Sequence, residues 1–210
     1  METSVDLTTL RDLTRGNPDF CEDNFFALSI ATKSLDKTAE SIYGLCLADS
    51  KGNKLYSAYV GQDVPDSSLG YDRLPRHEVR EDMTVSDILS EVIGMLPTGA
   101  KLFSSHADSW ARVIFSDALG KYPALQWDDT IRHIDIRALA RNIETGYIPD
   151  AGMTLESYCA IKLSFRLSLS EVASKFGVRE KVTIPAPEAK VIMTSELINI
   201  LMGKTIKIPR

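Results

Sequence analysis

The chain has 210 residues, of which 44% are hydrophobic and 25% are charged, and its formal net charge at pH 7 is -5. This composition is that of a globular protein with a sizeable core. The sequence contains no internal repeat and no low-complexity segment. A negative chain is a poor non-specific binder of polyanions, because phosphate contacts need clustered Lys and Arg, although a local basic groove remains open. One domain is expected at this length, and two small domains are the alternative.

The cysteines and the apolar runs indicate the cellular environment that we expect for the protein. Cys21, Cys46 and Cys159 are odd in number and widely spaced, which fits neither a disulfide framework nor a structural zinc site. Cys46 lies in an apolar run and is expected to be buried. The first twenty residues are mostly polar, and no run reaches the roughly 20 apolar residues that a membrane span needs. We therefore expect a cytoplasmic protein without a membrane partner.

Residues 1–22 are predicted to form an N-terminal extension. Leucines at every third position from Leu7 to Leu13 fit a short amphipathic helix, which Asn17–Pro18 would end. The segment is either a surface extension or a contact with a partner or a second copy of the chain, which would make a homodimer. Residues 23–202 are assigned to one domain and residues 203–210 to a basic tail.

Three strands are predicted at the start of the domain. The apolar residues from Phe25 to Ile30 favour a buried strand that ends in a small polar turn. Residues 41–48 and 54–60 favour two more strands, with a hairpin turn over 49–53. Residues 61–82 are rich in Gly, Asp, Pro and Ser, and they are predicted to form a loop.

Helices dominate the rest of the chain. Thr84 is a predicted N-cap for a helix that Pro97–Gly99 ends, and Asp135 is a predicted N-cap or strand-end residue. Ser168 and Glu171 form a predicted capping box. The remaining expected elements are a strand over 101–105, helices over 113–119, 155–163, 169–176 and 194–201, and a strand-to-helix segment over 131–141. This mixture predicts an α/β fold.

Residues 25–36 resemble the first motif of the DEDD 3′-5′ exonuclease superfamily, in its DEDDh type, to which the proofreading epsilon subunit belongs. That motif reads apolar-Asp-x-Glu-Thr followed by a Leu-Asp turn, and this chain keeps Thr32 and Leu35–Asp36. Further matches follow in the same order as in the family, over residues 77–83, 101–119, 131–141 and 168–178. The resemblance implies a ribonuclease-H-like exonuclease fold: a five-stranded mixed sheet flanked by helices on both faces, with its first three strands antiparallel.

The metal-binding carboxylates of the family are replaced in this chain. Two-metal phosphodiester hydrolysis needs a cluster of carboxylates that holds Mg²⁺ or Mn²⁺. The matching positions carry Ser29, Ala31, Ala111 and Lys190, and Pro185 stands at the general base. We therefore expect no catalytic residue, metal or cofactor. The chain would bind a single-stranded nucleic-acid end or a partner protein in a vestigial cleft formed by Ser29, Ala31, Thr32, His106, Trp110, Ala111 and Lys190.

Two alternatives remain open. The chain is an active metal-dependent 3′-5′ exonuclease if surrogate carboxylates rebuild the site, the candidates being Asp36, Asp108, Asp135 and Glu188. That alternative predicts that Asp108 or Glu188 points into the cleft of Ser29. The chain is otherwise an α/β protein of another kind. Trp110 and Trp127 either stack on bases or pack in the core, and core packing is the more common role of a tryptophan.

Overall fold

The computed structural model describes residues 19, 24–61, 64, 74, 76–105, 110–150, 152–160, 168–179 and 186–202. The amphipathic helix predicted over residues 7–13 and the basic tail over 203–210 lie outside the described residues. The same holds for the candidate residues His106, Asp108 and Pro185.

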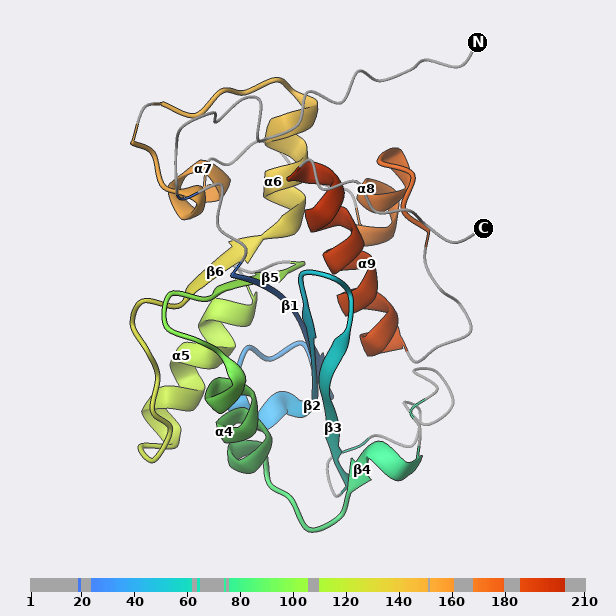
Figure 1. Ribbon diagram of the computed structural model, residues 1–210. Helices are drawn as coiled ribbons and strands as arrows, with labels where there is room; N and C mark the ends of the chain where they lie inside the picture. Colours follow the sequence, from blue (N-terminus) through green and yellow to red (C-terminus); the bar gives the residue numbers. More distant parts are fainter. Residues whose placement is uncertain are drawn as a thin grey trace.

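A mixed sheet forms the centre of the molecule (Figure 1). Its six strands are β1 (Phe25–Thr32), β2 (Ile42–Asp49), β3 (Lys54–Val60), β4 (Val79–Arg80), β5 (Lys101–Ser104) and β6 (Arg132–Asp135), in the order β4-β3-β2-β1-β5-β6. The first three strands pair antiparallel, whereas β5 pairs parallel with β1, β6 with β5 and β4 with β3. The predicted α/β class and the antiparallel pairing of the first three strands are confirmed.

The predicted count of five strands is wrong. The additional strand β4 has two residues and lies within the segment 61–82 that was predicted as a loop. It follows a short 3₁₀ helix, η3 (Arg76–Glu78). Tyr59 pairs with Val79 and Val60 with Arg80, so β4 exists only because the edge of β3 is there to pair with it. Two residues carry no periodic pattern, and the sequence therefore gives no local signal for this strand.

Helices cover both faces of the sheet, as predicted (Figure 1). On one face α4 (Val85–Met95) and α5 (Arg112–Lys121) pack on a cluster that includes Leu28 and Leu45. On the other, Ala27 and Cys46 face a cluster that contains residues of the remaining helices, α6 (Ile136–Glu144), α7 (Leu155–Ala160), α8 (Leu169–Lys175) and α9 (Ala186–Leu201). Neighbouring residues of a strand thus serve opposite cores, as the period of two requires. No helix in the described part of the chain is long and apolar enough to span a membrane.

Three predicted N-caps are confirmed, and one predicted helix start is wrong. Capping boxes are present at Thr84 and Ser168, and Asp135 accepts a hydrogen bond from the backbone N–H of Arg137 at 2.9 Å. The last helix, α9, begins at Ala186, eight residues before the predicted start at 194. Pro187 is tolerated there because the first helical turn needs no intrahelical N–H donor. Residue 190 therefore lies on a helix.

Loss of the capping box should destabilise α4 measurably. The Thr84 hydroxyl accepts from Asp87 N at 3.3 Å, and an Asp87 carboxylate oxygen accepts from Thr84 N at 2.7 Å. Thr84→Ala is expected to lower the free energy of unfolding by about 1 kcal/mol, because it removes an N-cap acceptor. Urea denaturation measures this change. Ser90→Ala, on the exposed side of the same helix, is the control and should cost nothing; an unchanged unfolding midpoint in Thr84→Ala would contradict the prediction.

Cys46 is buried with a free thiol, as predicted. Burial raises the pKa of the thiol to about 11, against the smaller opposite effect of hydrogen bonding with Ser57. Its Sγ lies 3.1 Å from Ser57 Oγ and 3.2 Å from the Tyr59 hydroxyl. A protonated thiol is neither a nucleophile nor a good metal ligand, so Cys46 has a packing role.

Candidate functional site

A pocket of about 530 Å³ opens where β5 stops and β1 continues. The parallel pairing of these strands ends at Ala27 and Phe103, so the following residues of β1 have a strand partner only on the β2 side. In open α/β sheets, ligands bind beyond the carboxyl ends of the strands, and this pocket has that position. Its volume is in the range of small-molecule sites. The pocket is lined by Leu28, Ser29, Ile30, Leu35, Ser104, Ser105, Trp110, Ala111, Ser168, Leu169, Ser170, Lys190 and Met193.

Four of the residues chosen from the sequence line this one pocket. Ser29 comes from β1, Trp110 and Ala111 immediately precede α5, and Lys190 comes from α9. Ala31 and Thr32 lie further along β1 and are not among the lining residues. Ala31 is opposite Gly44 of β2 and belongs to the buried core that contains residues of α9.

Trp127, the second tryptophan, packs in the core. Its ring stacks on that of His133, with centroids 5.4 Å apart and an angle of 6° between the planes. Phe115 completes this aromatic group, with its centroid 5.3 Å from that of Trp127. Both tryptophans pack against the same core cluster and are partly buried. Trp110 differs in that it also lines the pocket.

The candidate surrogate carboxylates that the structure describes are engaged elsewhere. Glu188 pairs with Lys54 at 3.3 Å, and Lys54 also pairs with Glu78 at 2.7 Å. The side chain of Asp135 lies 3.5 Å from Arg137 Nε. Asp36 accepts a hydrogen bond from the Ser34 hydroxyl at 2.9 Å. None of the three lines the pocket, so the contact that the active-enzyme alternative needs from Glu188 is not made.

The polar groups of the pocket are hydroxyls and one ammonium. Among the described lining residues there is no Asp, Glu or His, and no group of three or more His, Cys, Asp and Glu in the described chain is arranged to hold a metal ion. Lys190 is exposed, and it has no ion pair within the part of the chain that the structure describes. Lys37 Nζ lies 5.9 Å from the centroid of the Trp110 ring. Trp110 thus lies beside the ammonium of Lys37, and it lines a pocket to which Lys190 contributes a second ammonium.

Sequence reasoning missed most of the serines and the apolar walls. Ser104 is the last residue of β5, next to β1, and Ser105 follows it. This position could have been found by asking which residues end and follow the fourth long strand. Ser168 was considered only as a helix cap. Leu35 is 87% exposed, and it was read as part of a turn. No local signal identifies Met193 as a residue of the pocket wall, because its position there depends on how α9 crosses the sheet.

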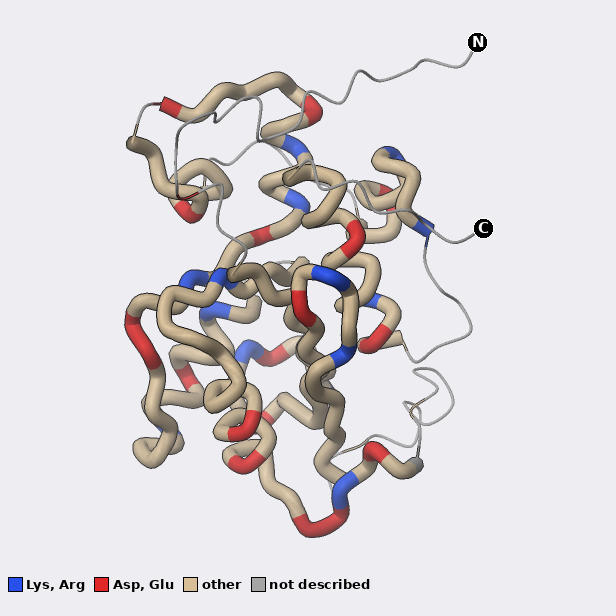
Figure 2. The backbone as a smooth tube through the Cα atoms, viewed as in Figure 1, with Lys and Arg blue, Asp and Glu red and all other residues tan. Residues whose placement is uncertain are grey.

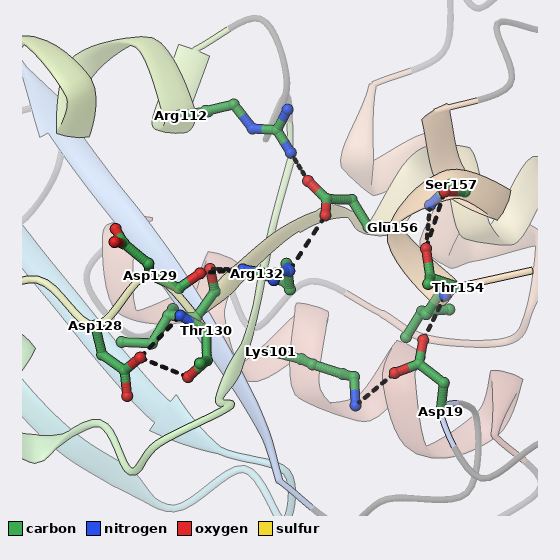
Figure 3. Close-up of polar contacts among 12 residues, drawn as sticks. Asp19, Lys101, Arg112, Asp128, Asp129, Thr130, Arg132, Thr154, Glu156 and Ser157 are labelled. Atoms are coloured by element: carbon green, nitrogen blue, oxygen red, sulfur yellow. Dashed lines mark hydrogen bonds and ion pairs between the residues drawn. The ribbon is translucent and has the colours of Figure 1, made fainter.

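Charged contacts tie α7 to the beginnings of β5, β6 and α5 (Figure 3). Glu156 pairs with Arg112 and, at 3.5 Å, with Arg132. Asp19 pairs with the buried Lys101 at 3.3 Å and accepts a hydrogen bond from the backbone N–H of Leu155 at 2.5 Å. At least this residue of the predicted N-terminal extension therefore packs against the domain, which the polar character of residues 1–22 did not suggest.

Comparison with known proteins does not assign the chain to a family. A scan of protein-family models finds no match. A search of curated protein sequences also finds none. The likeness to the exonuclease superfamily therefore rests on the motifs in the sequence and stays a hypothesis.

Proposed function

We propose that this protein is a catalytically degenerate member of the DEDD exonuclease superfamily, with a ribonuclease-H-like fold, that binds the end of a single nucleic-acid strand without hydrolysing it. The observation that carries the proposal is the composition of the pocket. Trp110 and Lys190 line it together with serine hydroxyls, and its described lining residues include no carboxylate.

The architecture is consistent with this proposal. A mixed sheet with three antiparallel strands, continued by parallel strands and covered by helices on both faces, suits a ribonuclease-H-like protein in general. The additional strand β4 lies at the edge of the sheet, away from the pocket strands β1 and β5. Its presence therefore leaves the proposed site unchanged.

The pocket chemistry suits a nucleotide. An aromatic face stacks on any base, and such stacking contributes about 1–3 kcal/mol per base. A lysine ammonium binds a phosphate as a point charge. Acidic and basic residues are interspersed over the described trace (Figure 2). This mixture of charges favours a contact with a strand end over a contact along many phosphates.

The same residues disfavour hydrolysis. Two-metal hydrolysis requires carboxylates to hold the ions and stabilise the leaving oxygen. At the positions that the family resemblance assigns to those carboxylates, Ser29 offers a neutral oxygen, Ala111 offers no ligand and Lys190 brings a positive charge. We infer that the ammonium replaces a metal as the partner of a phosphate, so that binding persists and the reaction does not.

The test is binding and degradation of 5′-fluorescein-labelled single-stranded DNA and RNA, with Mg²⁺ or Mn²⁺ and with EDTA. We expect saturable binding by fluorescence anisotropy in all conditions, with full-length oligonucleotide recovered. Lys190→Ala should weaken binding roughly tenfold, the lower end of the about 1.5–3 kcal/mol that a hydrogen bond to a charged group contributes. Lys51→Ala, in the exposed β2–β3 turn, is the charge-matched control and should bind like the original chain.

Two results would contradict the proposal. The first is equal affinity in Lys190→Ala and the original chain, or no binding of any oligonucleotide. The second is stepwise shortening from the 3′ end that EDTA abolishes, which would support the active exonuclease and direct attention to Asp108.

A further inference from the structure

The Ser104 hydroxyl is a buried polar group for which the described part of the chain offers no hydrogen bond. Ser104 is the last residue of β5, it lines the pocket, and it is 5% exposed. Its Oγ has no hydrogen-bond partner among the described residues. Its neighbour across the strand pair is Asp135, but that carboxylate caps α6 and pairs with Arg137. Buried hydroxyls in native proteins are nearly always hydrogen-bonded, so the orphaned Oγ requires an explanation.

The walls around Ser104 are apolar. Leu28, Ile30, Leu169 and Met193 contribute them, together with the Trp110 ring. A phosphate placed among these side chains would lose its hydration shell, which is costly without a cation in contact. The lysine of the pocket, Lys190, is solvent-exposed. The phosphate of a ligand therefore fits the solvent side of the pocket, and a flat apolar group with a polar edge fits its interior.

A nucleobase is such a group. We propose that the pocket takes the terminal base of the strand and that the Ser104 hydroxyl hydrogen-bonds its edge, so that Ser104 determines which base is preferred. This inference rests on the proposed function and adds specificity to it. A hydroxyl can donate or accept, so it favours a base that places a polar atom opposite Oγ over a base that places a carbon there, because the second base leaves the buried hydroxyl unpaired. Stacking on Trp110 contributes affinity for every base, and the hydrogen bond with Ser104 discriminates between the bases.

Free nucleosides test this proposal independently of any phosphate contact. Adenosine, cytidine, guanosine and uridine are titrated into the full chain, and binding is followed by ¹H–¹⁵N chemical shifts. We expect affinities that differ by about tenfold between the best and the worst nucleoside. In Ser104→Ala the four affinities should converge to within about twofold, since the discriminating hydrogen bond is lost while stacking remains.

Two further variants keep the test decisive. Ser104→Cys preserves the side-chain size but hydrogen-bonds weakly, and it should lose selectivity as Ser104→Ala does. Ser90→Ala, on the exposed side of α4, is the matched control and should retain the tenfold range. The amide spectrum of each variant, recorded without ligand, establishes that it is folded.

Each outcome bears on one proposal or the other. Equal affinities for all four nucleosides, no nucleoside binding, or an unchanged range in Ser104→Ala and Ser104→Cys would overturn the role of Ser104. If oligonucleotides still bind in a Lys190-dependent manner, the proposed function stands without it. Ser104-dependent nucleoside selectivity without oligonucleotide binding would support the base pocket and overturn the strand-end function.

Discussion

Gly44→Ala is expected to destabilise the fold by about 3 kcal/mol, the upper end of what overpacking a core usually costs. A Cβ at this position of β2 would lie 2.2 Å from Tyr59 Cδ1 and 2.7 Å from Tyr59 Cε1. Real Cβ atoms essentially never approach another heavy atom within 3.0 Å. The ring has little freedom to move away, because Tyr59 is fully buried and its hydroxyl contacts Cys46 Sγ at 3.2 Å.

The control for this substitution is the same change at an open position. Gly94 lies in α4, and nothing would come within 4 Å of an added Cβ there. Gly94→Ala is expected to stabilise the protein by about 0.5–1 kcal/mol, because alanine loses less conformational entropy in a helix. Urea denaturation of both variants measures the difference. A cost below about 1 kcal/mol for Gly44→Ala would show that the sheet accommodates the methyl group and that the prediction is wrong.

The clash expected in Gly44→Ala also has a consequence for the pocket. Gly44 pairs with Ala31 of β1, two residues beyond Ser29. A displacement of β2 to relieve the clash would therefore shift the strand that carries Ser29. We expect the folded fraction of Gly44→Ala to show weakened oligonucleotide binding as well.

The second large effect is acid destabilisation through His133. The ring is buried between Phe115 and Trp127, with centroids 5.1 Å and 5.4 Å away. Burial, and secondarily the positive charge of Arg112, lowers the pKa of His133 from 6.5 to about 4. Between these two values the unfolded chain binds a proton that the folded chain does not. The stability of the folded state is therefore unaffected by this group above pH 6.5 and falls as the pH is lowered towards 4. The resulting loss in the free energy of unfolding is about 3 kcal/mol between pH 7 and pH 4.

A non-titrating ring at the same position isolates this effect. In His133→Phe the difference in unfolding free energy between pH 7 and pH 4, measured by urea denaturation, should be smaller than in the original chain by about 3 kcal/mol. His77→Phe is the control for the substitution itself, because the side chain of His77 is 81% exposed and lies outside the core. If His133→Phe keeps the full pH dependence, another group is responsible for it.

Local chemistry explains why many elements were predictable. Thr84 with Asp87 and Ser168 with Glu171 satisfy backbone donors within one turn, so both helix starts can be read from four residues. The β2–β3 turn is equally local: the Asp49 carboxylate accepts from Lys51 N at 2.8 Å and from Asn53 N at 2.9 Å. The buried strands follow from runs of apolar residues, which need no information about their partners.

The sequence by itself determined the α/β class and most of the elements, because caps, turns and apolar runs act within a few residues. The resemblance of the motifs selected four residues that line the pocket, Ser29, Trp110, Ala111 and Lys190. Only the tertiary structure decided the strand β4, the pairing of Glu188 with Lys54, and the orphaned hydroxyl of Ser104. Each of these depends on groups brought together from distant parts of the chain, and no local pattern encodes such a distance.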